Sequence, residues 1–141
     1  MAAVNTRRVL LGAVAGGVVW SVWSILINVT VLGSRYATAQ EAGWFLKQPR
    51  YPYFLPVWLL TLFLLSYMGA WFYASCRATR GAGPATALKV GLLVGFAAGF
   101  PLNFSQATWS PVDRVFPLWW MLELWVGALL AALVAGWLYR D

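Results

Sequence analysis

Four long stretches of the chain carry almost no charged residue. The runs Val9–Leu32, Tyr51–Cys76 and Val90–Val112 contain none, and the run Val115–Tyr139 contains only Glu123. A helix needs about 20 apolar residues to cross roughly 30 Å of hydrocarbon, and each run is long enough. Since lipid offers no partner to an unpaired backbone group, helices are the expected solution. The pattern predicts an all-α integral membrane protein, a single domain over residues 1–141, with four transmembrane helices in a bundle at about 9–32, 54–76, 86–108 and 115–139.

The segments between the runs carry signals for helix ends. Within the loop Gly33–Arg50, the stretch Thr38–Glu41 has the pattern of a capping box, which predicts a short helix lying at the membrane interface. Pro84 suits the first position of the third helix. The stretch Ser110–Asp113 offers an N-cap, a proline and an acid, so the fourth helix is predicted to begin before its apolar run.

A weak internal similarity links the two halves of the chain. Gly16 precedes Asn28 by twelve residues, and Gly91 precedes Asn103 by the same number, with both asparagines in an Asn-x-Ser/Thr pattern. One interpretation is a pair of helical hairpins related by an axis along the membrane normal, a parallel repeat. Chance agreement in such a biased composition is the alternative.

Composition and charge agree with a membrane protein. The chain is 62% hydrophobic and 10% charged, whereas soluble domains carry roughly 25% charged residues. The net charge of +6 comes from Lys and Arg in short loops, which indicates lipid headgroups rather than nucleic acid as the partner. Six basic residues fall on the side of the termini: Arg7, Arg8, Arg77, Arg80, Lys89 and Arg140. Four fall on the other side: Arg35, Lys47, Arg50 and Arg114. The count predicts cytoplasmic termini in a bacterial inner membrane.

The residue inventory excludes several kinds of chemistry. Histidine is absent and Cys76 is the only cysteine, so we expect no disulfide within the chain, no zinc or haem site, and no cofactor. No serine has a histidine to activate it, and Glu41 is too far from Glu123 in depth to form a carboxylate pair. We therefore expect no enzyme, with an enzyme acting on lipid or quinone as the remaining catalytic alternative.

Small residues mark one face of each odd-numbered span. Gly12 and Gly16 form a GxxxG pattern in the first, and Gly91, Gly95 and Gly99 follow at four-residue spacing in the third. Helices associate in lipid where small residues let their backbones approach. Packing between the first and third spans is the simplest interpretation, and a homodimer seam or a ligand groove is the alternative.

Glu123 is the most informative residue. An acid within a span costs about 2.5–3.5 kcal/mol, so it should face the interior of the helix bundle and have a partner. It lies seven residues after Phe116, or ~10 Å into the membrane at 1.5 Å per residue, a depth that polar residues of the other spans share. Pro101 should free a backbone carbonyl and kink its helix there. The predicted ligand-binding residues are Glu123, Asn28, Asn103, Thr61 and Gln106.

Three explanations of this polar cluster stay open. In the first, the cluster is a buried hydrogen-bond network in which Glu123 carries its proton. In the second, it is a site for a ligand or ion. In the third, the Glu123 side chain faces the lipid and reaches toward the headgroups. The size, the four spans and one embedded Glu among aromatic residues are similar to small multidrug-resistance transporters, although that family has its essential Glu in the first helix. The stretch Gly99–Phe104 also looks like those of small bacterial four-helix families.

Two functional hypotheses follow from these patterns. The first is a binder or transporter of a small molecule or ion, centred on the Glu/Asn cluster. The second is an accessory or assembly subunit that packs, as a homo-oligomer or in a larger membrane complex, through its glycine faces and tryptophans. The first predicts a cavity at Glu123, and the second predicts a flat outer surface lined by Gly and Trp with Glu123 sealed inside.

Overall fold

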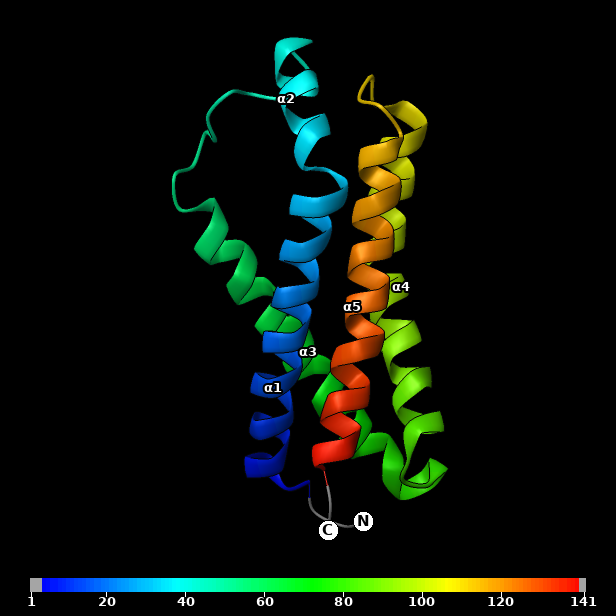
Figure 1. Cartoon of the computed structure of the whole chain (residues 1–141). Coiled ribbons are helices and arrows are strands. Elements are labelled where there is room, and N and C mark those ends of the chain that lie inside the picture. Colours follow the sequence, from blue (N-terminus) through cyan, green and yellow to red (C-terminus); the bar gives the residue numbers. More distant parts are fainter. Residues whose placement is uncertain (1–3, 140–141) are drawn as a thin grey trace.

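The computed structural model describes residues 4–139, and every regular element in that range is a helix (Figure 1). Four helical segments are long and apolar enough to cross a membrane: Thr6–Val31, Phe54–Arg80, Pro84–Trp109 and Val115–Leu138. The first comprises α1 (Thr6–Leu26) and a π-helical segment, η1 (Ile27–Val31). The short α2 follows (Gly33–Glu41), and then α3 (Phe54–Arg80), α4 (Pro84–Trp109) and α5 (Val115–Leu138). All four predicted helices are present.

The helix ends follow the sequence signals only in part. Pro84 is the first residue of α4, as predicted. Helix α5 begins at Val115, as the predicted span 115–139 requires, and only the earlier start indicated by Ser110–Asp113 is wrong. Asp113 instead accepts a hydrogen bond at Oδ1 from the Val115 amide (3.0 Å), so the acid orders the turn before the helix.

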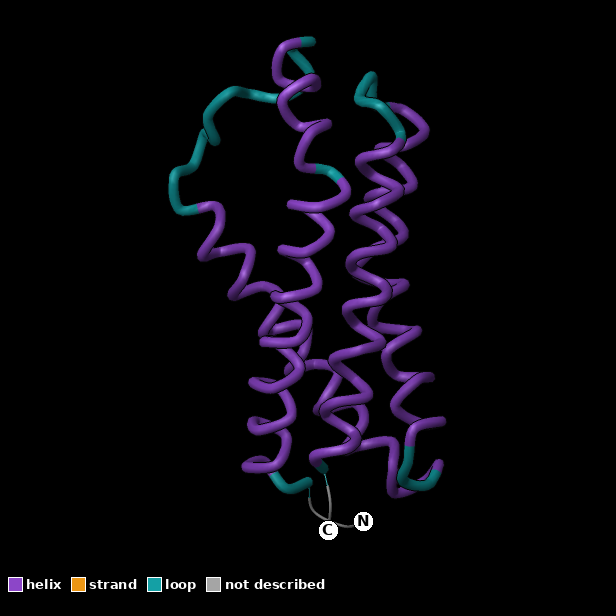
Figure 2. Tube along the Cα trace, in the orientation of Figure 1, coloured by secondary structure: helices purple, strands orange, loops and turns teal. Residues whose placement is uncertain are grey.

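The short helix α2 begins earlier than the capping-box pattern predicted. It starts at Gly33 and ends at Glu41, so Thr38–Glu41 forms its last turn rather than its first. The π-helical segment leads almost directly into it, with a hydrogen bond from the Leu32 amide to the Ile27 carbonyl (3.2 Å). Leu32 and Ala39 bury themselves against Phe116, so α2 is packed onto the start of α5. Figure 2 shows the long loop that then leads to α3.

Close contacts between small residues join α5 to its neighbours. A Cβ built on Gly12 would lie 3.1 Å from Ala135, and one built on Gly91 would lie 2.8 Å from the Cα of Leu129. Helix α5 therefore packs against the glycine face of α1 and against the glycine face of α4. The predicted pairing of the first and third spans is wrong: α1 and α4 hardly touch, and both glycine faces meet α5.

Helices α3 and α4 diverge from the loop that joins them. Helix α3 packs against α1 and α5, but its first half stands away from α4 and α5 (Figure 1). We call the end of the molecule that carries α2 the α2 end, and the other, where α1 begins and α5 ends, the terminal end. The divergence widens toward the α2 end. In a parallel repeat of two hairpins, the contact between α1 and α5 would correspond to the contact between α4 and α3. Helices α1 and α5 pack along each other, whereas α3 and α4 separate. The two halves of the chain are therefore not packed equivalently.

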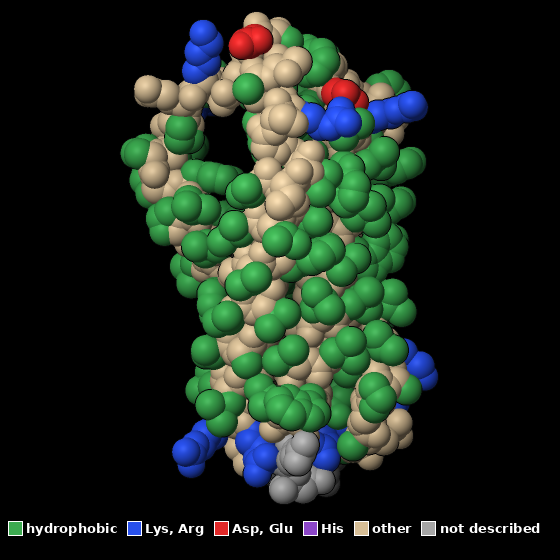
Figure 3. Space-filling view, viewed as in Figure 1, with side chains coloured by type: hydrophobic (Ala, Val, Ile, Leu, Met, Phe, Trp, Pro, Cys, Tyr) green, Lys and Arg blue, Asp and Glu red, His purple; other side chains and the backbone are tan. Residues whose placement is uncertain are grey.

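Apolar side chains cover the middle of the molecular surface. In Figure 3, Lys and Arg gather at both ends and hydrophobic side chains fill the belt between them. Leu11, Val22, Leu60 and Leu93 are among the large apolar residues that stay exposed along the four long helices. A water-soluble monomer rarely exposes a continuous apolar surface of this size.

Candidate functional site

A cavity of about 660 Å³ lies where α3 diverges, toward the α2 end of the molecule. Residues of α1, α2, α3, α4 and α5 and the loop after α2 all contribute to its walls. Apolar and aromatic side chains make up most of the lining, and a few polar groups converge on one side of it. A cavity of this size and composition is typical of sites that hold small molecules.

Glu123 of α5 is one of the residues that line this cavity, and its carboxyl oxygens are buried in the wall. The residue is only 1% exposed, yet neither carboxyl oxygen accepts a hydrogen bond of good geometry from any described residue. Ser24 lies close enough to interact with the group without completing such a bond. The indole of Trp23 donates to the backbone carbonyl of Glu123 (3.2 Å), which fixes the helix and leaves the carboxyl oxygens unpaired. Because buried polar atoms are normally paired, an acid in this state needs an explanation.

A chain of hydrogen bonds holds the wall formed by α1 and α2. The Trp120 indole donates to the Tyr36 hydroxyl (3.0 Å), which donates to Oδ1 of Asn28 (2.6 Å), and Nδ2 of Asn28 donates to the Ser24 carbonyl (2.9 Å). Burial raises the pKa of Tyr36, so its hydroxyl keeps the proton that it donates. These bonds use the Asn28 side chain at both ends and fix it in place.

The opposite wall is formed by α4 near Pro101. The helix continues through this proline, which has no amide hydrogen, so the carbonyl of Ala97 lacks its usual helical donor. Asn103 donates through Nδ2 to the Gly99 carbonyl (2.7 Å), while its Oδ1 accepts no bond from the described residues. Gln106 lines the cavity one turn further along. Asn103 and Gln106 thus place amide groups on the same cavity wall.

Aromatic rings enclose the side of the cavity nearest the α2 end. Three rings form a cluster: Tyr36, Phe45 and Trp120. The ring centroid of Phe45 lies 6.0 Å from that of Tyr36 and 6.0 Å from that of Trp120. Trp58 enters from α3, where its indole donates to the Ser24 hydroxyl (3.3 Å). Ring faces attract cations when they lie within about 6 Å. The site thus combines a carboxyl group with aromatic walls.

The structure brings together four of the five predicted site residues. Glu123, Asn28, Asn103 and Gln106 line the one cavity. Thr61 does not line it, because its hydroxyl donates to the Val57 carbonyl of its own helix (2.9 Å).

Sequence reasoning missed the roles of four cavity residues: Ser24, Tyr36, Trp58 and Trp120. Ser24 lies one helical turn before Asn28, so the polar spacing within the first span already indicated it. Nothing in the sequence singled out these two among the ten tryptophans. The position of Tyr36 depends on the π-helical segment that leads into α2, and no sequence pattern signals that segment.

The described part of the chain does not gather the side chains of a metal site. Among residues 4–139, no group of three or more His, Cys, Asp or Glu side chains lies close enough to hold a metal ion. What the lining offers is acceptor groups for hydrogen bonds, from the carboxyl group of Glu123 in the wall and the side-chain amides of Asn103 and Gln106. Comparison of the chain with protein-family models, with curated proteins and with solved structures gives no match.

Proposed function

We propose that the chain is an integral membrane protein whose four long helices cross the bilayer as a bundle. The apolar belt between two charged ends supports this, because its height is that of helices long enough to span the hydrocarbon core (Figure 3). The Lys/Arg count favours cytoplasmic termini, with the α2 end on the other side of a bacterial inner membrane. The bilayer is then its first partner.

Within the membrane, the proposed function is to bind a small molecule that donates hydrogen bonds, with a primary amine as the chemical class that fits best. One observation carries this proposal: both carboxyl oxygens of Glu123, which lines the cavity, are buried without a hydrogen bond of good geometry. The nearby donor is the hydroxyl of Ser24. A protonated amine supplies several donors and a charge that complements a carboxylate. The aromatic walls would attract the same charge.

A purely structural role for Glu123 has less support. In a network that only locks the helices, the polar side chains should bond to one another. Here Asn103 bonds to a backbone carbonyl and Asn28 bonds to Tyr36 and to a backbone carbonyl, and neither reaches Glu123. The Ser24 hydroxyl lies near the carboxyl group without completing a bond of good geometry, so the acid keeps acceptor capacity that a ligand can use.

The alternative function is that of an accessory subunit in a homo-oligomer or a larger membrane complex. Its main support in the sequence was the pair of glycine faces, which now pack against α5 within the chain. An accessory role would therefore need another surface, and the exposed tryptophans Trp109 and Trp137 favour it. The cavity at Glu123 supports small-molecule binding over the accessory role.

The test is a comparison of an amine with its neutral counterpart. Wild-type protein in phosphatidylcholine nanodiscs is titrated with benzylamine and with benzyl alcohol, and binding is followed by calorimetry. We expect the amine to bind at least ten-fold more tightly, and we expect Glu123→Gln to remove that preference while its melting temperature stays close to wild type. Equal binding of the two compounds, or an unchanged preference in the variant, would overturn the proposal.

A further inference from the structure

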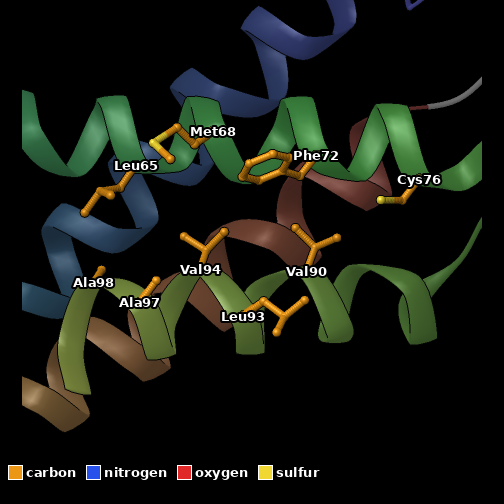
Figure 4. A pocket seen from close by; sticks show the side chains of 9 residues that line it. All are labelled: Leu65, Met68, Phe72, Cys76, Val90, Leu93, Val94, Ala97 and Ala98. Carbon is orange, nitrogen blue, oxygen red and sulfur yellow. The ribbon is translucent and has the colours of Figure 1, made fainter. Parts of the chain in front are cut away.

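A second, apolar cavity runs between α3 and α4 toward the terminal end. We call it the tail groove; its volume is about 500 Å³. Figure 4 shows Leu65, Met68, Phe72 and Cys76 on α3 pointing toward Val90 and its neighbours on α4. From Leu65 to Cys76 the groove follows eleven residues of helix, or about 16 Å at 1.5 Å per residue.

The tail groove lies next to the cavity that contains Glu123, because Ala98 of α4 lines both. The residues around the Glu123 cavity include the acid and two asparagines, whereas the tail groove is lined by apolar side chains, among them the thioether of Met68 and the thiol of Cys76. This is the polarity of an amphiphile, with a head and a tail.

Some of the side chains that line the groove are exposed on the molecular surface. Leu93 is 72% exposed and Met68 is 46% exposed, although both line it. In a bilayer, these side chains would face the acyl chains, so a hydrocarbon tail can enter sideways between α3 and α4.

We propose that the tail groove holds the single hydrocarbon chain of an amphiphilic amine whose head lies against Glu123. This rests on the proposed function, because the head occupies the site described there. A straight alkyl chain matches the length of the groove, about 16 Å along α3. The apolar walls contact such a chain without leaving one of its groups unpaired.

Photolabelling tests where the tail lies. Protein in phosphatidylcholine nanodiscs is irradiated with hexadecylamine that carries a diazirine near the end of its chain, and labelled residues are mapped by mass spectrometry. We expect labels within residues 65–76 and 90–98, at least five-fold above those on Leu11 and Val22, the exposed face of α1. Unlabelled hexadecylamine should compete, and hexadecyl sulfate should not. Equal labelling of all lipid-facing helices would overturn the proposal.

A pair of alanine variants tests the groove itself. Ala97 lines it and Ala85 does not, although both are exposed on α4. Ala97→Trp should reduce labelling of residues 65–76 at least five-fold, whereas Ala85→Trp should leave it unchanged. If Ala97→Trp lowers the melting temperature, Ala97→Leu replaces it in the comparison. Unchanged labelling in a folded Ala97 variant would contradict the proposal.

The outcomes separate this proposal from the one on which it rests. If benzylamine binds through Glu123 but the tail label does not map to the groove, the head site stands and the tail groove fails. If neither amine binds, both fail. Efficient disulfide formation between Cys76 of two copies, in a protein that is dimeric in nanodiscs, would show the groove to be an interface between chains and would overturn the tail proposal.

Discussion

Replacement of Gly91 by alanine should destabilise the protein through the contact between α4 and α5. The added Cβ would lie 2.8 Å from the Cα of Leu129 and 3.1 Å from the carbonyl oxygen of Ala128. Both are backbone atoms, so no side chain can rotate out of the way and the two helices must separate. Overpacking of this kind costs about 1–3 kcal/mol, and the better helix propensity of alanine returns at most about 1 kcal/mol. We expect a net loss of about 1–2 kcal/mol.

Gly69 supplies the matched control for this change. It is also buried within a long helix, but a Cβ built there would meet no atom within 4 Å. Gly69→Ala should therefore keep or raise the stability by up to about 1 kcal/mol, through helix propensity alone. The measurement is the free energy of unfolding in a mixed-micelle denaturant titration of both variants. If Gly91→Ala is as stable as Gly69→Ala, the close approach of α4 and α5 is wrong.

Three further changes test the orientation and the walls of the site. In a cysteine-free background, an impermeant thiol reagent should label Ala42→Cys in intact cells and leave Ala82→Cys unlabelled; the reverse pattern would contradict cytoplasmic termini. Tyr36→Phe removes a hydroxyl with two hydrogen bonds and should cost about 1–3 kcal/mol, whereas Tyr67→Phe, on an exposed side chain, should cost almost nothing. Equal losses would refute the network. Thr61→Val should leave benzylamine binding unchanged, and a ten-fold loss would place Thr61 in the site after all.

The charge-free runs predicted the helices well because the physics of a membrane span is local. Twenty apolar residues are read directly from the sequence, and Pro84 starts its helix as its fixed backbone angle requires. The prediction failed where the outcome depends on a partner. The Ser110–Asp113 stretch has the residues of a helix start, yet the Asp113 side chain caps a turn instead.

The depth of a residue along its helix can be counted from the sequence, but its contacts with other helices cannot. Glu123, Asn28 and Asn103 were grouped by depth, and they do share a cavity. Thr61 was grouped with them on the same grounds, but its helix diverges from α4 and its hydroxyl turns to its own backbone. Similarly, the glycines of α4 predicted a close contact between helices, but they did not indicate that α5, and not α1, would be the partner. Which faces meet is decided by the packing of the whole chain.

Infrared difference spectroscopy of the bound amine tests the central claim most directly. The sequence contains only four Asp and Glu residues, so the carboxyl region of the spectrum is simple. Adding benzylamine to wild-type protein should change a carboxyl band, and that change should be missing in Glu123→Gln. This result would mean that the ligand contacts the unpaired oxygens of Glu123. Identical difference spectra from the wild type and the variant would contradict the assignment of Glu123 as the group that binds the ligand.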